Sequence, residues 1–232
     1  MKHISVYGCG GTGSHVLNGL ARIDYALKTM GKKRFHVTAY DPDTVEDYNV
    51  GRQAFFPGDV GINKAKVLCE RINLYYHTNW RGMPNKAPSS DKVDLFISCV
   101  DTIKSREAIA KSWHKKGTYM IDCGNARASG QVLIGQFKGE LPNIYTEHAD
   151  LIYGEEPEDE VGCTDQYFRQ DLFINSTVAQ HACNFVWNLV RWGKVKHGGT
   201  FLDLDQGIAN SIKIEKDKMH NVENAATQAE AG

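Results

Sequence analysis

Hydrophobic and polar positions alternate in two patterns along the chain, one typical of β-strands and the other typical of α-helices. Short apolar runs rich in β-branched and aromatic residues occupy residues 4–7, 35–40, 93–100 and 119–123. In three intervening segments, which begin near residues 14, 64 and 104, apolar residues recur every three or four positions instead. The runs predict buried strands, and the second pattern predicts helices. Their alternation predicts βαβ units with right-handed crossovers, and therefore a parallel sheet.

The rest of the chain departs from this alternation. Residues 45–57 predict a loop with short helical turns, and the polar, proline-containing residues 78–91 predict a long surface loop. Three later segments predict an antiparallel strand, a strongly apolar helix and a terminal hairpin, at residues 131–137, 171–192 and 200–214. We therefore expect an α/β fold, namely a Rossmann-like, doubly wound and mostly parallel sheet with an antiparallel C-terminal extension.

The pattern indicates one domain over residues 1–215. Within it, residues 139–163 form an acidic connection that crosses over to the last helix and contains no Lys or Arg. Residues 216–232 are polar and alanine-rich with almost no core-forming residues, which predicts a disordered tail.

Composition narrows the class of protein. With 232 residues, of which 41% are hydrophobic and 24% charged, the chain has the composition of a soluble globular protein. A formal net charge of -1 gives no reason to expect nucleic acid or an anionic membrane as a partner. No apolar run approaches the roughly 20 residues of a membrane span, and no leader pattern precedes the first strand, so we expect a cytoplasmic protein. The six cysteines form no C-x-x-C pair, so we expect no zinc site.

A glycine-rich turn connects the first predicted strand to the first predicted helix. Gly8, Gly10 and Gly13 satisfy the pattern G-x-G-x-x-G, and Gly11 adds a further glycine. Such a turn exposes backbone N–H groups at a helix N-terminus, where the partial positive charge favours phosphate. By itself the pattern does not distinguish NAD, FAD and ATP sites.

Carboxylates follow two of the predicted strands directly. Asp41 and Asp43 come after the strand at residues 35–40, and Asp101 comes after the strand at residues 93–100. Ligands of parallel α/β sheets bind beyond the carboxyl ends of the strands. We therefore expect these three side chains at the same edge of the sheet as the glycine turn.

Five motifs in order resemble the ThiF/MoeB family, the bacterial relatives of ubiquitin-activating enzymes. They are Gly8-x-Gly-Gly-x-Gly13, Asp41-x-Asp43-x-Val45, Asn49 with Arg52-Gln53, Gly61-x-x-Lys64-Ala and Asp101 with Arg106. The resemblance runs from about residue 4 to 137 and continues more weakly to about 192. Further segments, among them Asn49-Val-Gly-Arg-Gln and Phe56-Pro-x-Asp-Val-Gly, are similar to the ThiF-related proteins of the PRTRC cassette of bacterial mobile elements.

The resemblance implies an ATP-binding adenylation domain whose catalytic residues are Arg52, Lys64, Asp101 and Cys163. It implies that Asp43 binds the ribose hydroxyls, that Arg52 and Lys64 contact the phosphates, and that Asp101 holds Mg²⁺. The remaining nucleotide contacts would come from Gly8, Gly10, Gly11, Gly13, Asp41, Asn49 and Gln53. Relatives are usually homodimers, so a homodimer is expected as well.

Each residue also has an ordinary structural interpretation. Asp43 could form a turn after Pro42, and Asp101 could cap the helix that follows it. Arg52 and Lys64 taken singly resemble surface cations. Arg106 could pair on a helix surface with Glu107 or Asp101, which would look identical in the sequence.

Cys163 lies where many relatives carry a cysteine that accepts the activated protein as a thioester. The carboxylates just before it would raise the pKa of its thiol and reduce the thiolate fraction, unless a helix N-terminus or a cation offsets them. A thioester role and a purely structural role therefore both stay open.

Three functions are compatible with the sequence. The first is an ATP-dependent adenylyltransferase that activates the C-terminal carboxylate of a small ubiquitin-like or sulfur-carrier-like protein and could pass it to Cys163. The second is a non-catalytic, ATP-binding assembly module of a PRTRC cassette. The third and least favoured is an NAD-dependent oxidoreductase with Asp41 on the ribose, because Lys64 and Arg52-Gln53 would have no role in it.

Overall fold

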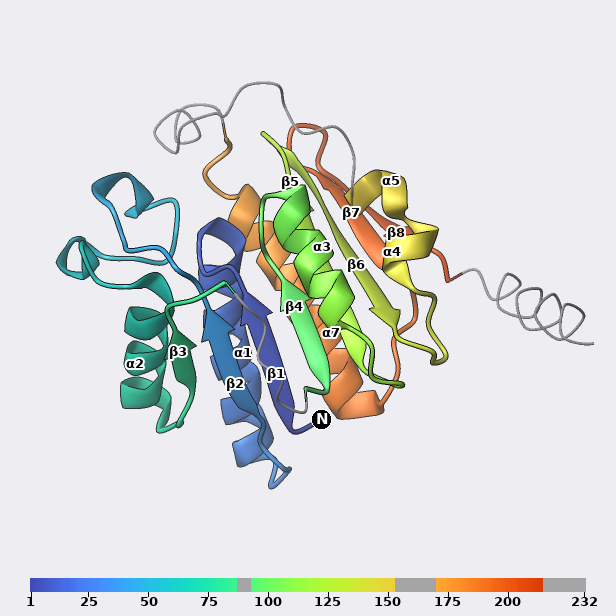
Figure 1. Cartoon of the computed structure of the whole chain (residues 1–232), viewed down its shortest axis with the longest axis horizontal. Helices are drawn as coiled ribbons and strands as arrows, with labels where there is room; N and C mark the ends of the chain where they lie inside the picture. The colour runs from blue at the N-terminus through green and yellow to red at the C-terminus, as the bar shows by residue number, and fades with distance from the viewer. Residues whose placement is uncertain (87–92, 153–169, 215–232) are drawn as a thin grey trace, which may run out of the picture.

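The computed structural model describes residues 1–86, 93–152 and 170–214, and one mixed sheet runs through all three parts (Figure 1). Its eight strands lie in the order β3-β2-β1-β4-β5-β6-β7-β8. They are β1 (His3–Tyr7), β2 (His36–Tyr40), β3 (Arg81–Met83), β4 (Leu95–Ser98), β5 (Tyr119–Asn125), β6 (Ser129–Gln136), β7 (Gly199–Asp203) and β8 (Ile208–Ile212). The described helices are α1 (Gly11–Thr29), α2 (Lys64–Tyr76), α3 (Ile103–Ser112), α4 (Ile144–Glu147), α5 (Ala149–Ile152) and α7 (Ile174–Trp192), with the 3-10 turns η1 (Asp47–Asn49) and η2 (Pro57–Asp59).

The strand directions confirm the predicted fold class. Strands β1 to β5 pair in parallel, and β6, β7 and β8 continue the sheet in antiparallel pairs. Strand β1 lies between β2 and β4, so the chain leaves β1 toward one side and later returns on the other. This reversal is the topological switch point, beyond which ligands of doubly wound sheets bind. We call the C-terminal ends of β1 to β5 and the loops that follow them the carboxyl edge, and the opposite ends the amino edge.

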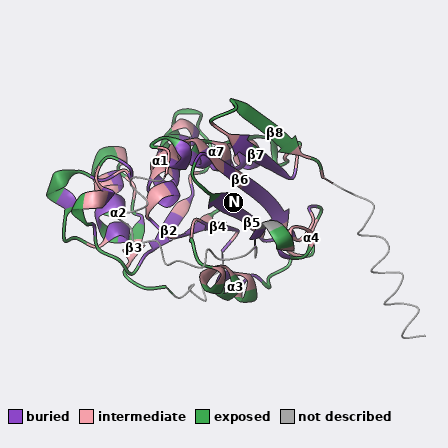
Figure 2. Cartoon of the chain, turned by 90° about the horizontal axis from the view of Figure 1, so that it is seen from above, coloured by how far each residue is buried: buried purple, intermediate pink, exposed green. Residues whose placement is uncertain are grey.

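Helices cover both faces of the sheet, as the view from above shows (Figure 2). Helices α1 and α7 pack on one face, where the larger hydrophobic cluster includes Leu17, Ile97 and Val186. Helix α3 covers the other face over a second cluster, which includes Phe96 and Met120. Successive residues of a central strand point to opposite faces of the sheet and so belong to different clusters. Both faces are buried, which explains why the central strands are continuous apolar runs in the sequence.

Strand β3 corrects the prediction of a surface loop over residues 78–91. Residues Arg81–Met83 pair in parallel with β2. The strand is three residues long and none of its residues is fully buried, so no apolar alternation marks it. Packing holds it instead, because a Cβ on Gly82 would lie 2.3 Å from the Ala65 carbonyl oxygen of α2. The last part of the predicted loop lies outside the described residues.

The other predicted elements are present with small shifts of their ends. The third helix ends at Ser112 rather than near residue 116, and the segment at 45–57 contains η1 and is followed by η2. Cys163, most of the acidic connection and the tail at 216–232 lie outside the described residues. Within the described ranges, none of the helices is long and apolar enough to cross a membrane.

Candidate functional site

The glycine turn of residues 8–13, hereafter the glycine loop, lies at the switch point between β1 and β4. Gly8 has a φ of +82°, and a Cβ there would lie 2.7 Å from the carbonyl oxygen of Cys99, the first residue after β4. A Cβ on Gly13 would lie 1.8 Å from the carbonyl oxygen of Gly8. Only glycine avoids both collisions, so the close approach of α1 to the strands requires these two residues.

The N-terminus of α1 opens directly from this loop. Its N-cap residue is Gly10, which has no side chain to cap the helix, and its first turn contains no acidic residue. The amides of a first helical turn lack partners within the helix. This terminus therefore presents N–H donors and a partial positive charge that suit an anion.

The two aspartates after β2 lie in different environments. Asp41 is buried, and its carboxylate accepts hydrogen bonds from the backbone N–H groups of Cys9 (2.6 Å) and Asp43 (2.9 Å). Burial raises the pKa of Asp41, while those two hydrogen bonds and the charge of Lys64 oppose the increase. The Asp43 side chain is 66% exposed. Asp41 thus holds the glycine loop against β2, and Asp43 is the carboxylate more accessible to a ligand.

Two cations at this edge are buried, unlike ordinary surface cations. Arg52 is 4% exposed and Lys64 is 8% exposed. Lys64 is the first residue of α2, and its Nζ lies 3.6 Å from Oδ2 of Asp43. Removing cations from water costs free energy, so their burial here needs compensation by nearby polar groups or by an anion.

Gln53 is an unusual buried amide beside the same loop. It is 5% exposed, and its Oε1 has no hydrogen-bond partner among the described residues. A Cβ on Gly10 would lie 3.7 Å from this oxygen, so the amide faces the glycine loop. Buried polar atoms are nearly always hydrogen-bonded in folded proteins. Only a hydrogen-bond donor, such as a hydroxyl group of a bound ligand, could satisfy this acceptor.

Asn49 shapes the loop that carries Arg52 and Gln53. Its Oδ1 accepts a hydrogen bond from the backbone N–H of Glu46 at 3.0 Å and closes the turn η1. The backbone N–H of Gln53 then donates to the Asn49 carbonyl oxygen at 3.0 Å. The structure therefore connects Asn49 to the loop.

Asp101 follows β4 and is exposed. The next residue, Thr102, is the N-cap of α3, and its Oγ1 accepts a hydrogen bond from the backbone N–H of Ser105 at 3.3 Å. Thr102 rather than Asp101 therefore caps the helix. In the described part of the chain, no three His, Cys, Asp or Glu side chains come together as a metal-binding group. A single carboxylate still fits Mg²⁺, which is commonly held by one or two carboxylates together with phosphate oxygens and water.

Arg106 points into the protein rather than along the edge. Its Nε lies 3.6 Å from Oδ1 of the fully buried Asp122, and its Nη1 donates to the Ile152 carbonyl oxygen at 3.2 Å. Burial raises the pKa of Asp122, and the charge of Arg106 opposes the increase. Arg106 thus connects α3 to β5 and α5, and both surface pairings considered for it were wrong.

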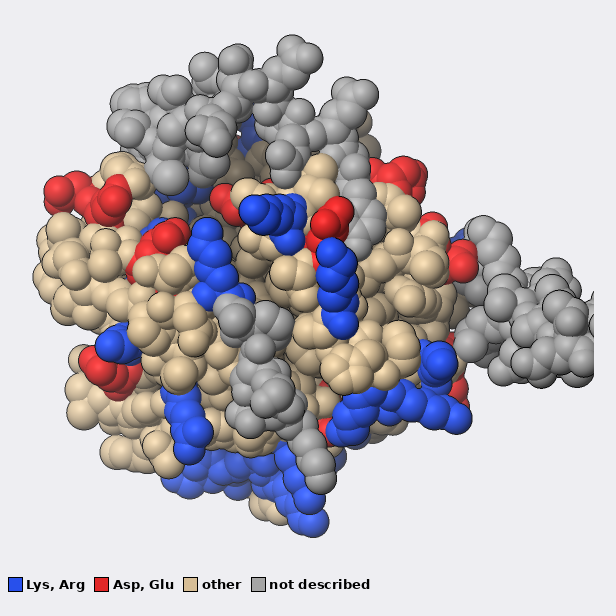
Figure 3. Space-filling model, viewed as in Figure 1, with Lys and Arg blue, Asp and Glu red and all other residues tan. Residues whose placement is uncertain are grey.

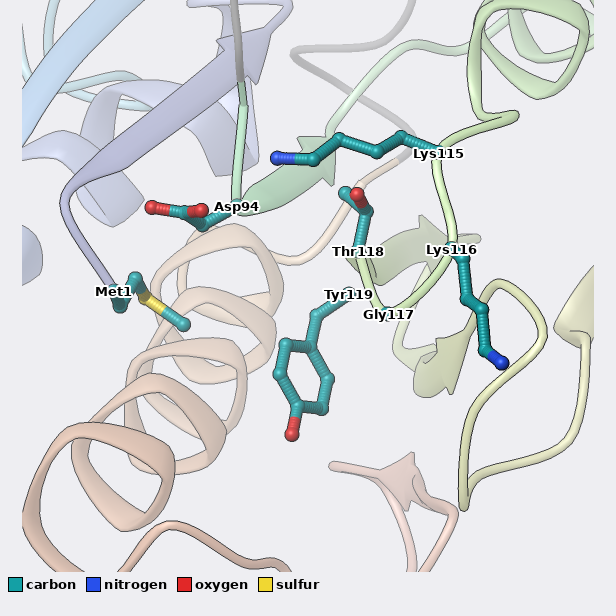
Figure 4. A pocket seen from close by; sticks show the side chains of 7 residues that line it. All are labelled: Met1, Asp94, Lys115, Lys116, Gly117, Thr118 and Tyr119. Atoms are coloured by element: carbon teal, nitrogen blue, oxygen red, sulfur yellow. The ribbon is translucent and has the colours of Figure 1, made fainter.

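The structure also has a cleft, which lies at the amino edge and not at the carboxyl edge that carries the glycine loop (Figure 4). It is lined by Met1, Asp94, Lys115, Lys116, Gly117, Thr118 and Tyr119. Tyr119 is the first residue of β5, whereas the glycine loop follows the last residue of β1. The cleft is therefore separate from the glycine loop, Arg52 and Lys64.

The glycine loop and the residues around it lie within a segment that matches a known protein family. A model of the ThiF family matches residues 1–192, which include the loop and every predicted site residue. The chain belongs to the ThiF family.

Known proteins include one with a similar sequence and two solved structures with a similar fold. The adenylyltransferase and sulfurtransferase UBA4 of Yarrowia lipolytica is 27% identical over 145 residues, which are 60% of this chain and 34% of UBA4. The chain thus spans about a third of that relative. A crystal structure of PaaA shares the fold with a TM-score of 0.67 at 17% identity, over 93% of this chain and 73% of PaaA. Escherichia coli MccB, solved with ATP, has a TM-score of 0.63 at 16% identity, over 93% of this chain and 64% of MccB.

Within this ThiF domain, sequence reasoning missed a polar group where the chain enters α7. Asn175 is 2% exposed and contacts the glycine loop, and Gln170 contacts Arg52. Asn175 shares one helix face with the apolar Val178 and Ala182, so a polar residue on the predicted core face was the available signal. Gln170 precedes the helix and offers no comparable signal.

Proposed function

We propose that the protein is an ATP-dependent adenylyltransferase. It would activate the C-terminal carboxylate of a small ubiquitin-like or sulfur-carrier-like protein. The observation that carries the proposal is the burial of Arg52 and Lys64 at the carboxyl edge, beside a helix N-terminus whose N-cap, Gly10, has no side chain. This edge combines donors and cations in a form that suits a polyphosphate.

The reaction needs electrostatic help more than proton transfer. A carboxylate oxygen of the partner forms a bond to the α-phosphorus of ATP, the bond between the α- and β-phosphates breaks, and pyrophosphate leaves. The nucleophile is already ionised at neutral pH, so no general base is required. The protein must bring two anions together in line and stabilise the charge on the leaving group, which fixed cations and N–H donors can do.

The residues of the carboxyl edge supply these roles in the proposal. Asp43, the exposed carboxylate, binds the ribose hydroxyls, while Asp41 keeps the glycine loop in place. Arg52 and Lys64 bind the phosphates. Asp101 would hold Mg²⁺, which when bound neutralises phosphate charge, and the exposed position of Asp101 at the end of β4 fits that role.

The relatives support a nucleotide and a peptide or protein substrate. UBA4 is named an adenylyltransferase, and MccB has been solved both with ATP and with MccA. Because the chain spans only part of UBA4 and MccB, we take the activity and the substrate class as a proposal for this chain.

Exchange of radioactive pyrophosphate into ATP tests the proposal. Exchange should appear when a protein with a free C-terminal tail, encoded by a neighbouring gene, is added, and Asp101→Ala should abolish it. Asp150→Ala, which changes an exposed carboxylate on α5, is the matched control and should leave the exchange intact. ATP binding without exchange for any candidate would favour the PRTRC assembly module, and NAD binding without ATP binding would favour the oxidoreductase.

The thioester role of Cys163 stays a prediction, because this residue lies outside the described part of the chain. If Cys163 has this role, the protein should form a covalent thioester with the activated partner, and thiol reducing agents should break that bond. An adduct of this kind that persists in Cys163→Ala would refute the role.

A further inference from the structure

A series of side-chain hydrogen bonds connects Arg52 to the segment that enters α7. Nη1 of Arg52 donates to Oε1 of Gln170 at 2.7 Å, and Nδ2 of Asn175 donates to the same oxygen at 3.0 Å. Nε2 of Gln170 donates to the Ala126 carbonyl oxygen at 3.1 Å. Both ends of the Gln170 amide therefore have partners, which fixes the orientation of the oxygen that faces Arg52.

Asn175 continues the series to the glycine loop. Its Oδ1 accepts hydrogen bonds from Oγ1 of Thr12 at 3.2 Å and from Nδ2 of Asn125 at 3.1 Å. A Cβ on Gly11 would lie 2.3 Å from the same oxygen, so the asparagine lies directly against the loop backbone. Asn175 is 2% exposed, and because buried polar groups are nearly always hydrogen-bonded, these contacts account for its burial.

This arrangement places Arg52 relative to the start of α1. An arginine side chain has several rotatable bonds, and fixing them at the moment of ligand binding costs conformational entropy. Gln170 holds the guanidinium, and Asn175 holds the Gln170 oxygen, before any ligand arrives. Gln170 takes one of the five N–H donors of a guanidinium, so the contact is compatible with donation to phosphate oxygens by the same group.

We propose that Gln170 and Asn175 are positioning residues, which hold the Arg52 guanidinium at the distance from the glycine loop that a nucleotide phosphate requires. The inference rests on the proposed function only as far as ATP binding. It adds two residues that no family motif of the sequence pointed to. They act through Arg52 and not by touching the nucleotide.

The test compares affinities for ATP and for adenosine, because Arg52 binds the phosphates in the proposed function and adenosine has none. Gln170→Leu, which keeps most of the side-chain volume, should weaken ATP binding about tenfold, the usual effect of losing a hydrogen bond to a charged group. Adenosine affinity, followed by NMR titration, should not change. A general folding defect would weaken both, so the ratio of the two affinities separates positioning from stability.

Gln136→Leu is the matched control. The Gln136 amide also has partners at both ends, since its Oε1 accepts from the Glu140 N–H at 2.9 Å and its Nε2 donates to the Gly117 carbonyl oxygen at 2.9 Å. It lies at the amino edge, opposite Tyr119 in the β5–β6 pair. The control variant should bind ATP and adenosine as the unchanged protein does.

Two outcomes would overturn the inference, and they are distinguishable. If the unchanged protein binds ATP and Gln170→Leu binds it equally well, Gln170 does not position Arg52, and the proposed function stands. If the unchanged protein binds no ATP, the proposed function fails and the inference fails with it. Should Gln170→Leu not fold, Gln170→Ala removes the same amide from this half-buried position and is measured in the same way.

Discussion

The two edges of the sheet carry cations of the same kind in opposite environments. At the carboxyl edge, Arg52 and Lys64 are almost completely buried beside the glycine loop. At the amino edge, Lys115 and Lys116 are exposed around a cleft, and Lys and Arg side chains gather along the lower border of the molecule in Figure 3. A buried cation costs free energy that an exposed one does not. Buried charge therefore distinguishes the candidate functional edge, whereas the cleft lies at the other edge.

The largest expected effect comes from the glycine loop. Gly13→Ala places a Cβ against the Gly8 carbonyl oxygen, so α1 must move away from β1, and the N–H groups proposed to bind phosphate move with it. ATP affinity should fall by at least about a hundredfold, since one misplaced positioning group can cost that much. Isothermal titration with ATP measures the loss.

Gly117→Ala is the corresponding change at the amino edge. Gly117 has a φ of +81° and nothing within 4 Å of a Cβ, so the variant should lose about 1 kcal/mol of stability from backbone strain. Its ATP affinity should stay unchanged. A loss of ATP binding in Gly117→Ala would contradict the assignment of the edges.

The next largest effect concerns the cations themselves. Arg52→Met and Lys64→Met should each weaken ATP binding by about thirty- to a hundredfold, because each removes a desolvated charge from the proposed phosphate site. Lys115→Met removes an exposed charge from the amino edge and should change the affinity less than twofold at about 0.15 M salt. If Lys115→Met weakened ATP binding as much as Arg52→Met and Lys64→Met do, ATP affinity would depend only on the net charge of the protein and not on these two sites.

Gln53 offers a sharper test because two measurements should respond differently. Gln53→Leu removes a buried carbonyl oxygen that has no partner among the described residues, so the free energy of unfolding without ligand should be unchanged or about 1 kcal/mol higher. ATP affinity should fall about three- to tenfold, because the amide then cannot contact the ligand. Loss of stability together with unchanged affinity would show that Gln53 is a structural residue.

The smallest effect is a pH dependence shared by both edges. Burial lowers the pKa of His15, beside Arg52, and that of His36, at the start of β2. As the pH falls below about 6.5, these histidines are protonated more readily in the unfolded chain than in the folded protein. Protonation therefore favours the unfolded chain, and both histidines lower the free energy of unfolding at acid pH. His15→Gln and His36→Gln should each make the decline of Tm below that pH shallower. Thermal unfolding curves across this range measure it, and unchanged slopes would exclude these two histidines as its source.

Most of the fold could be predicted because the central strands are buried on both faces. Their apolar runs, such as residues 93–100, are visible without any tertiary information. Strand β3 could not be predicted, since three partly exposed residues are held by α2 rather than by their own pattern. Local sequence therefore specified the centre of the sheet, and packing specified this edge.

The candidate site could be predicted only where a motif is local. The glycine loop and Lys64 each belong to a motif of a few consecutive residues, and both lie at the carboxyl edge in the structure. Gln170 and Arg52 are 118 positions apart, and they meet only because the fold places the segment before α7 beside the loop that carries Arg52. Arg106 shows the same limit, because its buried partner Asp122 belongs to another element and no spacing in the sequence points to it.

The most direct measurement of the central claim is an ATP titration of the isotope-labelled protein, followed through its backbone amide signals. The amides of Gly10, Gly11 and Thr12 at the carboxyl edge should shift in a saturable manner, and those of Gly117 and Thr118 should not. Adding NAD should produce no comparable shifts. Saturable shifts confined to Gly117 and Thr118, or the same response of the glycine loop to NAD alone, would contradict the account.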